Sequence, residues 1–219
     1  MLATNKNILI VEGKTERYSI PELMDFHTVW GNKPKEWVVE ILETNGIDGI
    51  LKTKVISTAS KTPKLHALGV IIDADDKFTA RWTQLKSLCE EIAEGFPEEL
   101  PEEGLIYVTT KGLRIGVWIM PDNSSRGMME TFLSLMLSPE CSHIWGVAKK
   151  TCSEVSELPN SFKGIHQDKS QIHAYLAWID PPGQTLPEAI ISKAINANSP
   201  LAQQFVSWMM NLFELTPRN

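Results

Sequence analysis

The chain has 219 residues and a mass of 24.6 kDa, and 42% of its residues are hydrophobic and 22% charged. This composition excludes a disordered or fibrous protein and allows a sizeable core. The 27 acidic and 21 basic residues leave a formal net charge of −6, so a nucleic acid would need a local basic patch to bind. With no signal-peptide pattern and no apolar run near the roughly 18 residues that span a bilayer, we expect a cytoplasmic protein without a membrane partner.

Strands and helices alternate along the first two thirds of the chain. A β-branched run at 8–11 predicts a strand that is buried on both faces. The patterns that follow predict helices over 14–26, 37–42, 78–93 and 127–137, and strands at 54–57, 68–72, 106–108 and 115–120. This alternation predicts an α/β fold, with a mainly parallel sheet flanked by helices.

The pattern becomes helical after Pro139. Apolar spacing predicts helices over 172–179, 187–197 and 201–212, the last of them capped by Ser199 and Pro200. We therefore divide the chain into an α/β domain over 1–138 and a C-terminal helical extension over 139–219. No linker-like composition separates the two parts, so we expect the extension to pack on the domain as one structural unit.

Acidic residues follow three of the predicted strands. Glu12 ends the first strand, Asp73 and Asp75 end the strand at 68–72, and Glu130 follows the turn after the last strand. Open α/β sheets bind ligands at the carboxyl ends of their strands, so we expect a site there. Asp73 and Asp75 are two residues apart, so in an extended chain they project to the same side and can hold one divalent cation.

Glu16 and Asp76 are close enough in sequence to add ligands to that cation. Taken alone, the acids at 73–76 are also typical of a solvated turn that caps a helix. The neighbouring Gly13-Lys14-Thr15 has the last letters of a phosphate-binding P-loop, but that motif requires a glycine where Ile8 stands.

Together these motifs resemble the Toprim domain shared by topoisomerases, bacterial primases and the overcoming-lysogenization-defect (OLD) nucleases. The resemblance starts from Val11-Glu12-Gly13-x-x-Glu16 and Asp73-x-Asp75, each at the end of a predicted strand. The chain is closer still to small stand-alone bacterial Toprim-like proteins of unknown function related to those nucleases. That closer resemblance includes the runs 116–123, 127–130 and 169–178, and it covers nearly the whole chain.

The resemblance implies a metal-dependent phosphoryl-transfer site, and most simply a nuclease or another nucleic-acid-processing enzyme. Glu12 matches a glutamate that serves in acid–base chemistry or metal binding, and Asp73 and Asp75 match aspartates that bind Mg²⁺. Nuclease members add an acid and a lysine, for which Glu130 and Lys169 are the closest positions. The implied cofactor is Mg²⁺ or Mn²⁺, and the candidate metal ligands are Glu12, Glu16, Asp73, Asp75, Asp76 and Glu130.

Two groups of lysines offer contacts to the phosphates of a nucleic acid. They are Lys52, Lys54, Lys61 and Lys64, and Lys149, Lys150, Lys163 and Lys169. Two other classes of function stay open. One is a catalytically silent metal-binding module that acts through a partner, for example beside an ATPase in phage defence, or through self-association. The other is a receiver-like signalling domain with an acidic Mg²⁺ pocket, although the early Val-Glu-Gly turn favours a Toprim domain.

Overall fold

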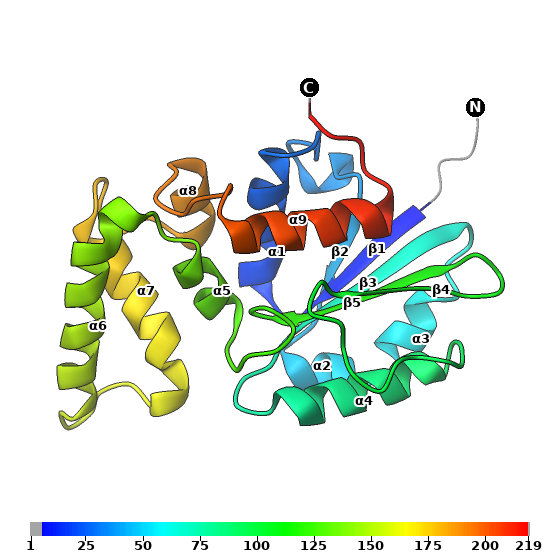
Figure 1. The fold of residues 1–219 in the computed structure, drawn as a ribbon, viewed down its shortest axis with the longest axis horizontal. Helices are drawn as coiled ribbons and strands as arrows, with labels where there is room; N and C mark the ends of the chain where they lie inside the picture. Colours follow the sequence, from blue (N-terminus) through cyan, green and yellow to red (C-terminus); the bar gives the residue numbers. More distant parts are fainter. Residues whose placement is uncertain (1–5, 219) are drawn as a thin grey trace.

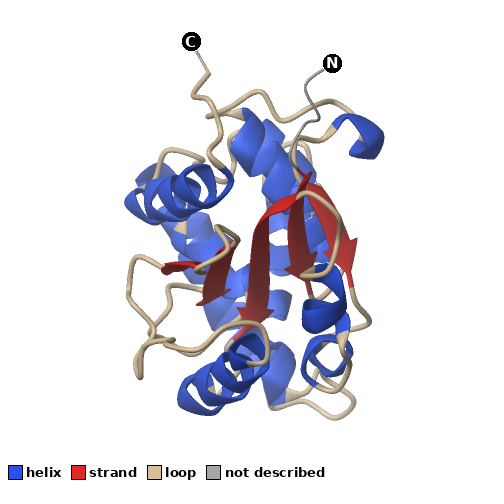
Figure 2. Cartoon of the chain, turned by 90° about the vertical axis from the view of Figure 1, so that its right-hand side faces the viewer, coloured by secondary structure: helices blue, strands red, loops and turns tan. Residues whose placement is uncertain are grey.

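A computed structural model describes residues 6–218 and shows a five-stranded sheet with helices on both faces (Figures 1 and 2). The strands are β1 (Lys6–Val11), β2 (Glu40–Glu43), β3 (Leu65–Asp73), β4 (Leu105–Val108) and β5 (Arg114–Met120). Their order in the sheet is β2-β1-β3-β5-β4, and all neighbours pair in parallel except β4 and β5. The predicted α/β fold with a mainly parallel sheet is thus confirmed.

The helices form two layers and a lateral hairpin. One face of the sheet is covered by α1 (Lys14–Asp25), α5 (Met129–Leu135) and α9 (Pro200–Phe213), and the other by α2 (Ile47–Leu51), α3 (Val55–Ala59) and α4 (Phe78–Glu90). Helices α6 (Ser142–Ser156) and α7 (Gln167–Trp178) pair beside α5, and α8 (Leu186–Ile191) packs on α1 (Figure 1). Within residues 6–218, no helix has the length and apolar character needed to cross a membrane.

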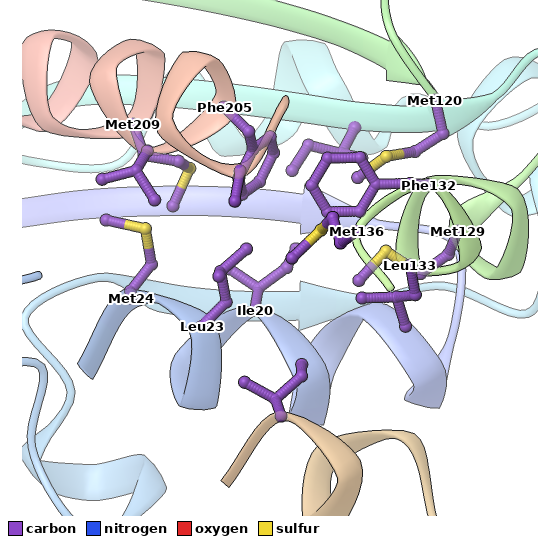
Figure 3. Packing of buried hydrophobic residues seen from close by; sticks show 14 of the residues in the cluster. Ile20, Leu23, Met24, Met120, Met129, Phe132, Leu133, Met136, Phe205 and Met209 are labelled. Carbon is purple, nitrogen blue, oxygen red and sulfur yellow. The ribbon is translucent and has the colours of Figure 1, made fainter. Parts of the chain in front are cut away.

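Alternate side chains of each strand serve two separate cores. Leu9 and Val11 face the core under α1, α5 and α9, whereas Ile8 and Ile10 face the core above α2, α3 and α4. Central strands of a parallel sheet need apolar residues on both faces for this reason. Figure 3 shows part of the first core, in which methionines surround two phenylalanines; the labelled residues include Met24, Met120, Met129, Phe132, Met136, Phe205 and Met209.

Two predicted elements in the N-terminal half were wrong. The region predicted as a helix over 37–42 forms β2, an edge strand of four residues in which Ile41 is buried and Glu40 is exposed. The region predicted as a strand at 54–57 belongs to α3, whose buried side chains are Ile56 and Ala59. Both elements are too short for their apolar periodicity to separate strand from helix.

Helix boundaries in the second half also differ from the predictions. The structure has α6 over a range where no helix was predicted, and α7 begins five residues earlier than expected, at Gln167. The helix predicted over 187–197 ends at Ile191, because the chain then pairs with the residues after α5. The backbone N–H of Asn196 donates to the carbonyl of Met136 at 2.9 Å, and Leu137 and Ile195 form a β-bridge.

The described part of the helical extension, residues 139–218, adds to the core of the sheet instead of forming its own. Side chains of α6 to α9 belong to the same apolar cluster as those of β1, β3, α1 and α5. The end of α9 is bound by Arg114 of β5, whose guanidinium donates to the carbonyls of Asn211 and Leu212 at 2.7 and 2.9 Å. A cation there binds the last carbonyls of the helix and interacts favourably with the negative end of the helix dipole.

A pair of glycines allows α9 to approach the sheet closely. Gly69 of β3 and Gly116 of β5 are neighbours in register, and Leu212 packs over them. A Cβ on Gly116 would lie 2.3 Å from Cδ2 of Leu212.

We expect Gly116→Ala to lower the free energy of unfolding by about 1–3 kcal/mol, because the added methyl group overpacks this contact. Urea denaturation measures the change. Gly146→Ala is a matched control, because a Cβ at this position of α6 meets nothing within 4 Å. It should leave the protein as stable or slightly more stable, since alanine favours helix. Equal stability of the two variants would contradict the described contact.

Candidate functional site

Four carboxylates meet at the carboxyl ends of the central strands. Glu12 follows β1, Asp73 ends β3, and Glu16 and Glu130 lie in the first turns of α1 and α5. They line one open cleft of about 480 Å³ together with Lys169 of α7, and we call it the carboxylate cleft. Because β1 and β3 are adjacent and parallel, their ends fall at the same edge of the sheet.

Glu12 and Asp73 are connected by hydrogen bonds at the centre of the cleft. The backbone N–H of Asp73 donates to Oε1 of Glu12 at 2.8 Å. The N–H of Met129, at the start of α5, donates to Oδ1 of Asp73 at 3.0 Å. These bonds link the ends of two strands to the helix that carries Glu130, so they fix three of the four carboxylates relative to one another.

The carboxylates of Glu16 and Glu130 are nearly buried. Glu16 is 5% exposed, and its Oε2 accepts from the N–H of Gly13 at 2.9 Å. Glu130 is 4% exposed, and its Oε1 lies 3.1 Å from Nζ of Lys169. The Lys169 side chain is itself half-exposed, so its ammonium group faces both the cleft and solvent.

Burial and mutual repulsion raise the pKa values of three of these acids. Burial raises the pKa of Glu12 to about 7, and the charges of Glu16 and Asp75 add to the effect. Burial also raises the pKa of Glu16, with a contribution from Glu130. The pKa of Asp73 lies well above its usual range, first because of burial and then because of the surrounding carboxylates. A cation in the cleft would relieve this repulsion.

Asp75 and Asp76 line an adjacent cleft of about 500 Å³. Asp75 has a φ of 50°, so the chain after Asp73 is not extended, and the expectation that the two aspartates project to the same side was wrong. Oδ2 of Asp75 accepts from Nη2 of Arg81 at 2.7 Å, and Asp76 lies 3.6 Å from Arg126. The structure therefore separates these two acids from the other four, although the charge of Asp75 still acts on Glu12 and Asp73.

Several residues of the carboxylate cleft were missed. They include a fifth carboxylate, Glu43 at the end of β2, with Thr44 and Asn45 of the loop after it, and Lys14 and His166 also line the cleft. The Thr44 hydroxyl lies 3.3 Å from the carbonyl of Val11, so it supports the end of β1. The signal for these residues is a polar run directly after a strand, and the helix predicted over 37–42 conceals that strand.

Most of the predicted lysines lie away from the carboxylate cleft. Lys52, Lys54, Lys61 and Lys64 lie in and around α2 and α3, and Lys149 and Lys150 lie on α6. Lys169 is the member of these groups that lines the carboxylate cleft among the described residues. Lysine contacts at the site therefore come from Lys169 of α7 and from Lys14 of α1, which was not a member of the predicted groups.

The fold and the cleft define an α/β protein with clustered carboxylates at the strand ends. The chain belongs to the family described as "Protein of unknown function (DUF3226)", which it matches over residues 6–214. No curated protein and no solved structure matches the chain. The matched range contains the five strands and the helices α1 to α9 of the described structure, so the whole cleft lies within the family region.

The raised pKa of Glu12 predicts a pH-dependent stability. Protonated Glu12 contributes stability that is fully present below its ordinary pKa of 4.5 and is lost as the pH rises through about 7. Glu12→Gln keeps an acceptor for the Asp73 N–H and carries no charge. It should therefore raise the free energy of unfolding by about 2 kcal/mol more at pH 8 than at pH 5.

Urea denaturation in EDTA at the two pH values measures this difference. Glu99→Gln serves as the control, because Glu99 is exposed in the loop after α4, and its effect should be the same at both pH values. An equal effect of Glu12→Gln at pH 5 and pH 8 would show that Glu12 does not carry a buried charge.

Proposed function

We propose that the carboxylate cleft binds Mg²⁺ or Mn²⁺ and supports metal-dependent phosphoryl transfer, most simply the cleavage of nucleic acid. The observation that carries this proposal is the convergence of Glu12, Glu16, Asp73 and Glu130 at the strand ends, where burial raises carboxyl pKa values. Perturbed acids gathered in a cleft are typical of functional sites. The Toprim-like motifs of the sequence support the same activity.

The donor set has the chemistry of a site for a hard cation. Its acidic side chains offer carboxylate oxygens, which Mg²⁺ prefers, and their hydrogen bonds to Asp73, Met129 and Gly13 each use one oxygen. Among residues 6–218, no three His, Cys, Asp or Glu side chains are arranged to hold an ion. Mg²⁺ keeps several waters and is usually bound by one or two carboxylates together with substrate phosphates, so two protein ligands are enough for the proposed site.

Each residue of the cleft has a separate role in the proposed reaction. Asp73 and Glu130 would hold the cation, supported by Glu16, and such an ion supplies positive charge for the scissile phosphate. Glu12 accepts the proton of the attacking water, since a pKa of about 7 matches general base catalysis at neutral pH. Lys169 places its ammonium group where negative charge develops on the phosphate.

A second candidate is the catalytically silent metal-binding module that acts through an ATPase partner or through self-association. The ion pair between Lys169 and Glu130 favours it, because the lysine is already bound to a protein group. Metal binding without cleavage of any nucleic acid would identify this second function.

Asp73→Asn should weaken Mn²⁺ binding by about 10-fold or more and abolish cleavage, because it removes a charge from the centre of the cleft. Isothermal titration calorimetry measures binding. Gel assays with labelled single-stranded and double-stranded DNA and RNA, in Mg²⁺, Mn²⁺ or EDTA, measure cleavage.

Asp75→Asn is the matched control, because Asp75 pairs with Arg81 in the adjacent cleft. It should retain most of the Mn²⁺ affinity. An equal loss in both variants would mean that Asp75 turns toward the ion, as the Asp-x-Asp motif implies. Unchanged Mn²⁺ affinity in Asp73→Asn would refute the metal site.

Lys169→Gln should lower the cleavage rate at saturating metal by about 100-fold, because one donor to the developing charge is lost. Its Mn²⁺ affinity should stay the same or increase, since the substitution removes a cation that competes for Glu130. Lys111→Gln, in the exposed turn between β4 and β5 at the opposite edge of the sheet, is the control and should cleave at the unchanged rate. Lys169 has no part in catalysis if the two variants cleave equally fast.

A further inference from the structure

The carboxylate cleft continues into a second hollow of about 600 Å³ between α1 and α7, which we call the side groove. Lys14 and Thr15, in the first turn of α1, line both the cleft and the groove. The segment 183–187, which leads into α8, forms the third wall of the groove. A ligand that extends from the cleft past Lys14 therefore enters the side groove.

The wall formed by α1 presents a cation, then an aromatic ring and then, at the end far from the cleft, the carboxylate of Glu22. Lys14 stands at the boundary with the cleft, and Tyr18 follows one helical turn later on the same face. The Tyr18 residue is 47% exposed, and the guanidinium of Arg17 lies 6.0 Å from the centre of its ring. Four residues of helix rise about 6 Å, so the two side chains can contact the phosphate and the base of a single nucleotide.

The opposite wall, formed by α7, also has a cationic side chain followed by an aromatic one. On α7, Lys169 faces the cleft, and His173, one turn later, faces the side groove. Burial lowers the pKa of His173, so its ring is neutral at neutral pH and can both donate and accept hydrogen bonds. At the third wall, Gln184 is held by a hydrogen bond from its amide to the Pro181 carbonyl and by one from the Ser192 hydroxyl.

We propose that the side groove binds a base of single-stranded nucleic acid, stacked on Tyr18, beside a phosphate in the carboxylate cleft. This inference rests on the proposed function and adds its substrate class. Cationic groups followed by an exposed aromatic ring match the alternation of phosphate and base in a single strand. A duplex cannot offer a base to Tyr18 without unstacking it, whereas the bases of a single strand are already accessible.

Fluorescence anisotropy tests the proposal with labelled oligothymidine, in EDTA to prevent cleavage and at one fixed salt concentration. Tyr18→Ala should weaken binding about 5- to 100-fold, because it removes the stacking ring. Tyr18→Phe retains a ring and should bind like the original protein. Trp178→Ala is the matched control, because Trp178 is 46% exposed at the end of α7, outside the groove, and its loss should have no effect.

Three results would overturn the proposal. The first is a Tyr18→Ala variant that binds oligothymidine no more weakly than Trp178→Ala. The second is a duplex that binds at least as tightly as the single strand. The third is thymidine monophosphate that binds as tightly as the oligonucleotide, which would identify a site for free nucleotides. An oligouridine probe, expected to show the same Tyr18 dependence, reports whether RNA is also bound.

Failure of this inference is distinguishable from failure of the proposed function. Tyr18→Ala should keep the Mn²⁺ affinity of the original protein, because Tyr18 does not line the carboxylate cleft. Asp73→Asn should bind oligothymidine in EDTA at least as tightly as the original protein, because the substitution removes a negative charge beside the phosphate. Tyr18-dependent binding without metal-dependent cleavage would refute the nuclease activity and leave the side groove in place, whereas cleavage without any effect of Tyr18 would refute the side groove alone.

Discussion

The hydrogen bond from the Asp73 amide to the Glu12 carboxylate joins two central strands, and the geometry of the site depends on it. Parallel pairing of β1 and β3 places these residues, 61 positions apart in sequence, at the same edge of the sheet. The bond itself lowers the pKa of Glu12, but burial at the edge of the sheet outweighs it and raises that pKa to about 7. The adjoining bond from Met129 fixes α5, and therefore Glu130, to the same point.

Clustering these acids destabilises the folded protein. A buried carboxylate loses its hydration, and the charges of its neighbours add to that cost. The surrounding structure offsets it with two apolar cores and with the Arg114 contacts that hold α9. Locally unfavourable arrangements that a stable scaffold maintains are typical of functional sites. The unfavourable burial of charge and the sheet topology therefore both indicate a functional site at the carboxyl ends of the strands.

The long buried strands made most of the fold predictable from the sequence. β1, β3 and β5 contain continuous apolar runs that are buried on both faces, so the strands and their carboxyl ends were evident. Glu12 and Asp73 could therefore be placed at strand ends. β2 was not predictable, because a four-residue edge strand takes its identity from pairing with β1. The position of Asp75 was equally hidden, since it depends on a positive φ and on an ion pair with Arg81.

The helical extension is part of the site, because α7 supplies both Lys169 and His173. The Thr131 hydroxyl of α5 donates to the Asp168 carboxylate at the start of α7, and Lys169 pairs with Glu130 on the same helix, α5. If α7 moved away, Glu130 would remain buried without its cation, a state that is strongly disfavoured. The packing of α7 against α5 therefore depends on the negative charge of Glu130. Under the proposed function, a cation at Glu130 would compete with Lys169 for the same carboxylate, and a released Lys169 would be free to contact a phosphate.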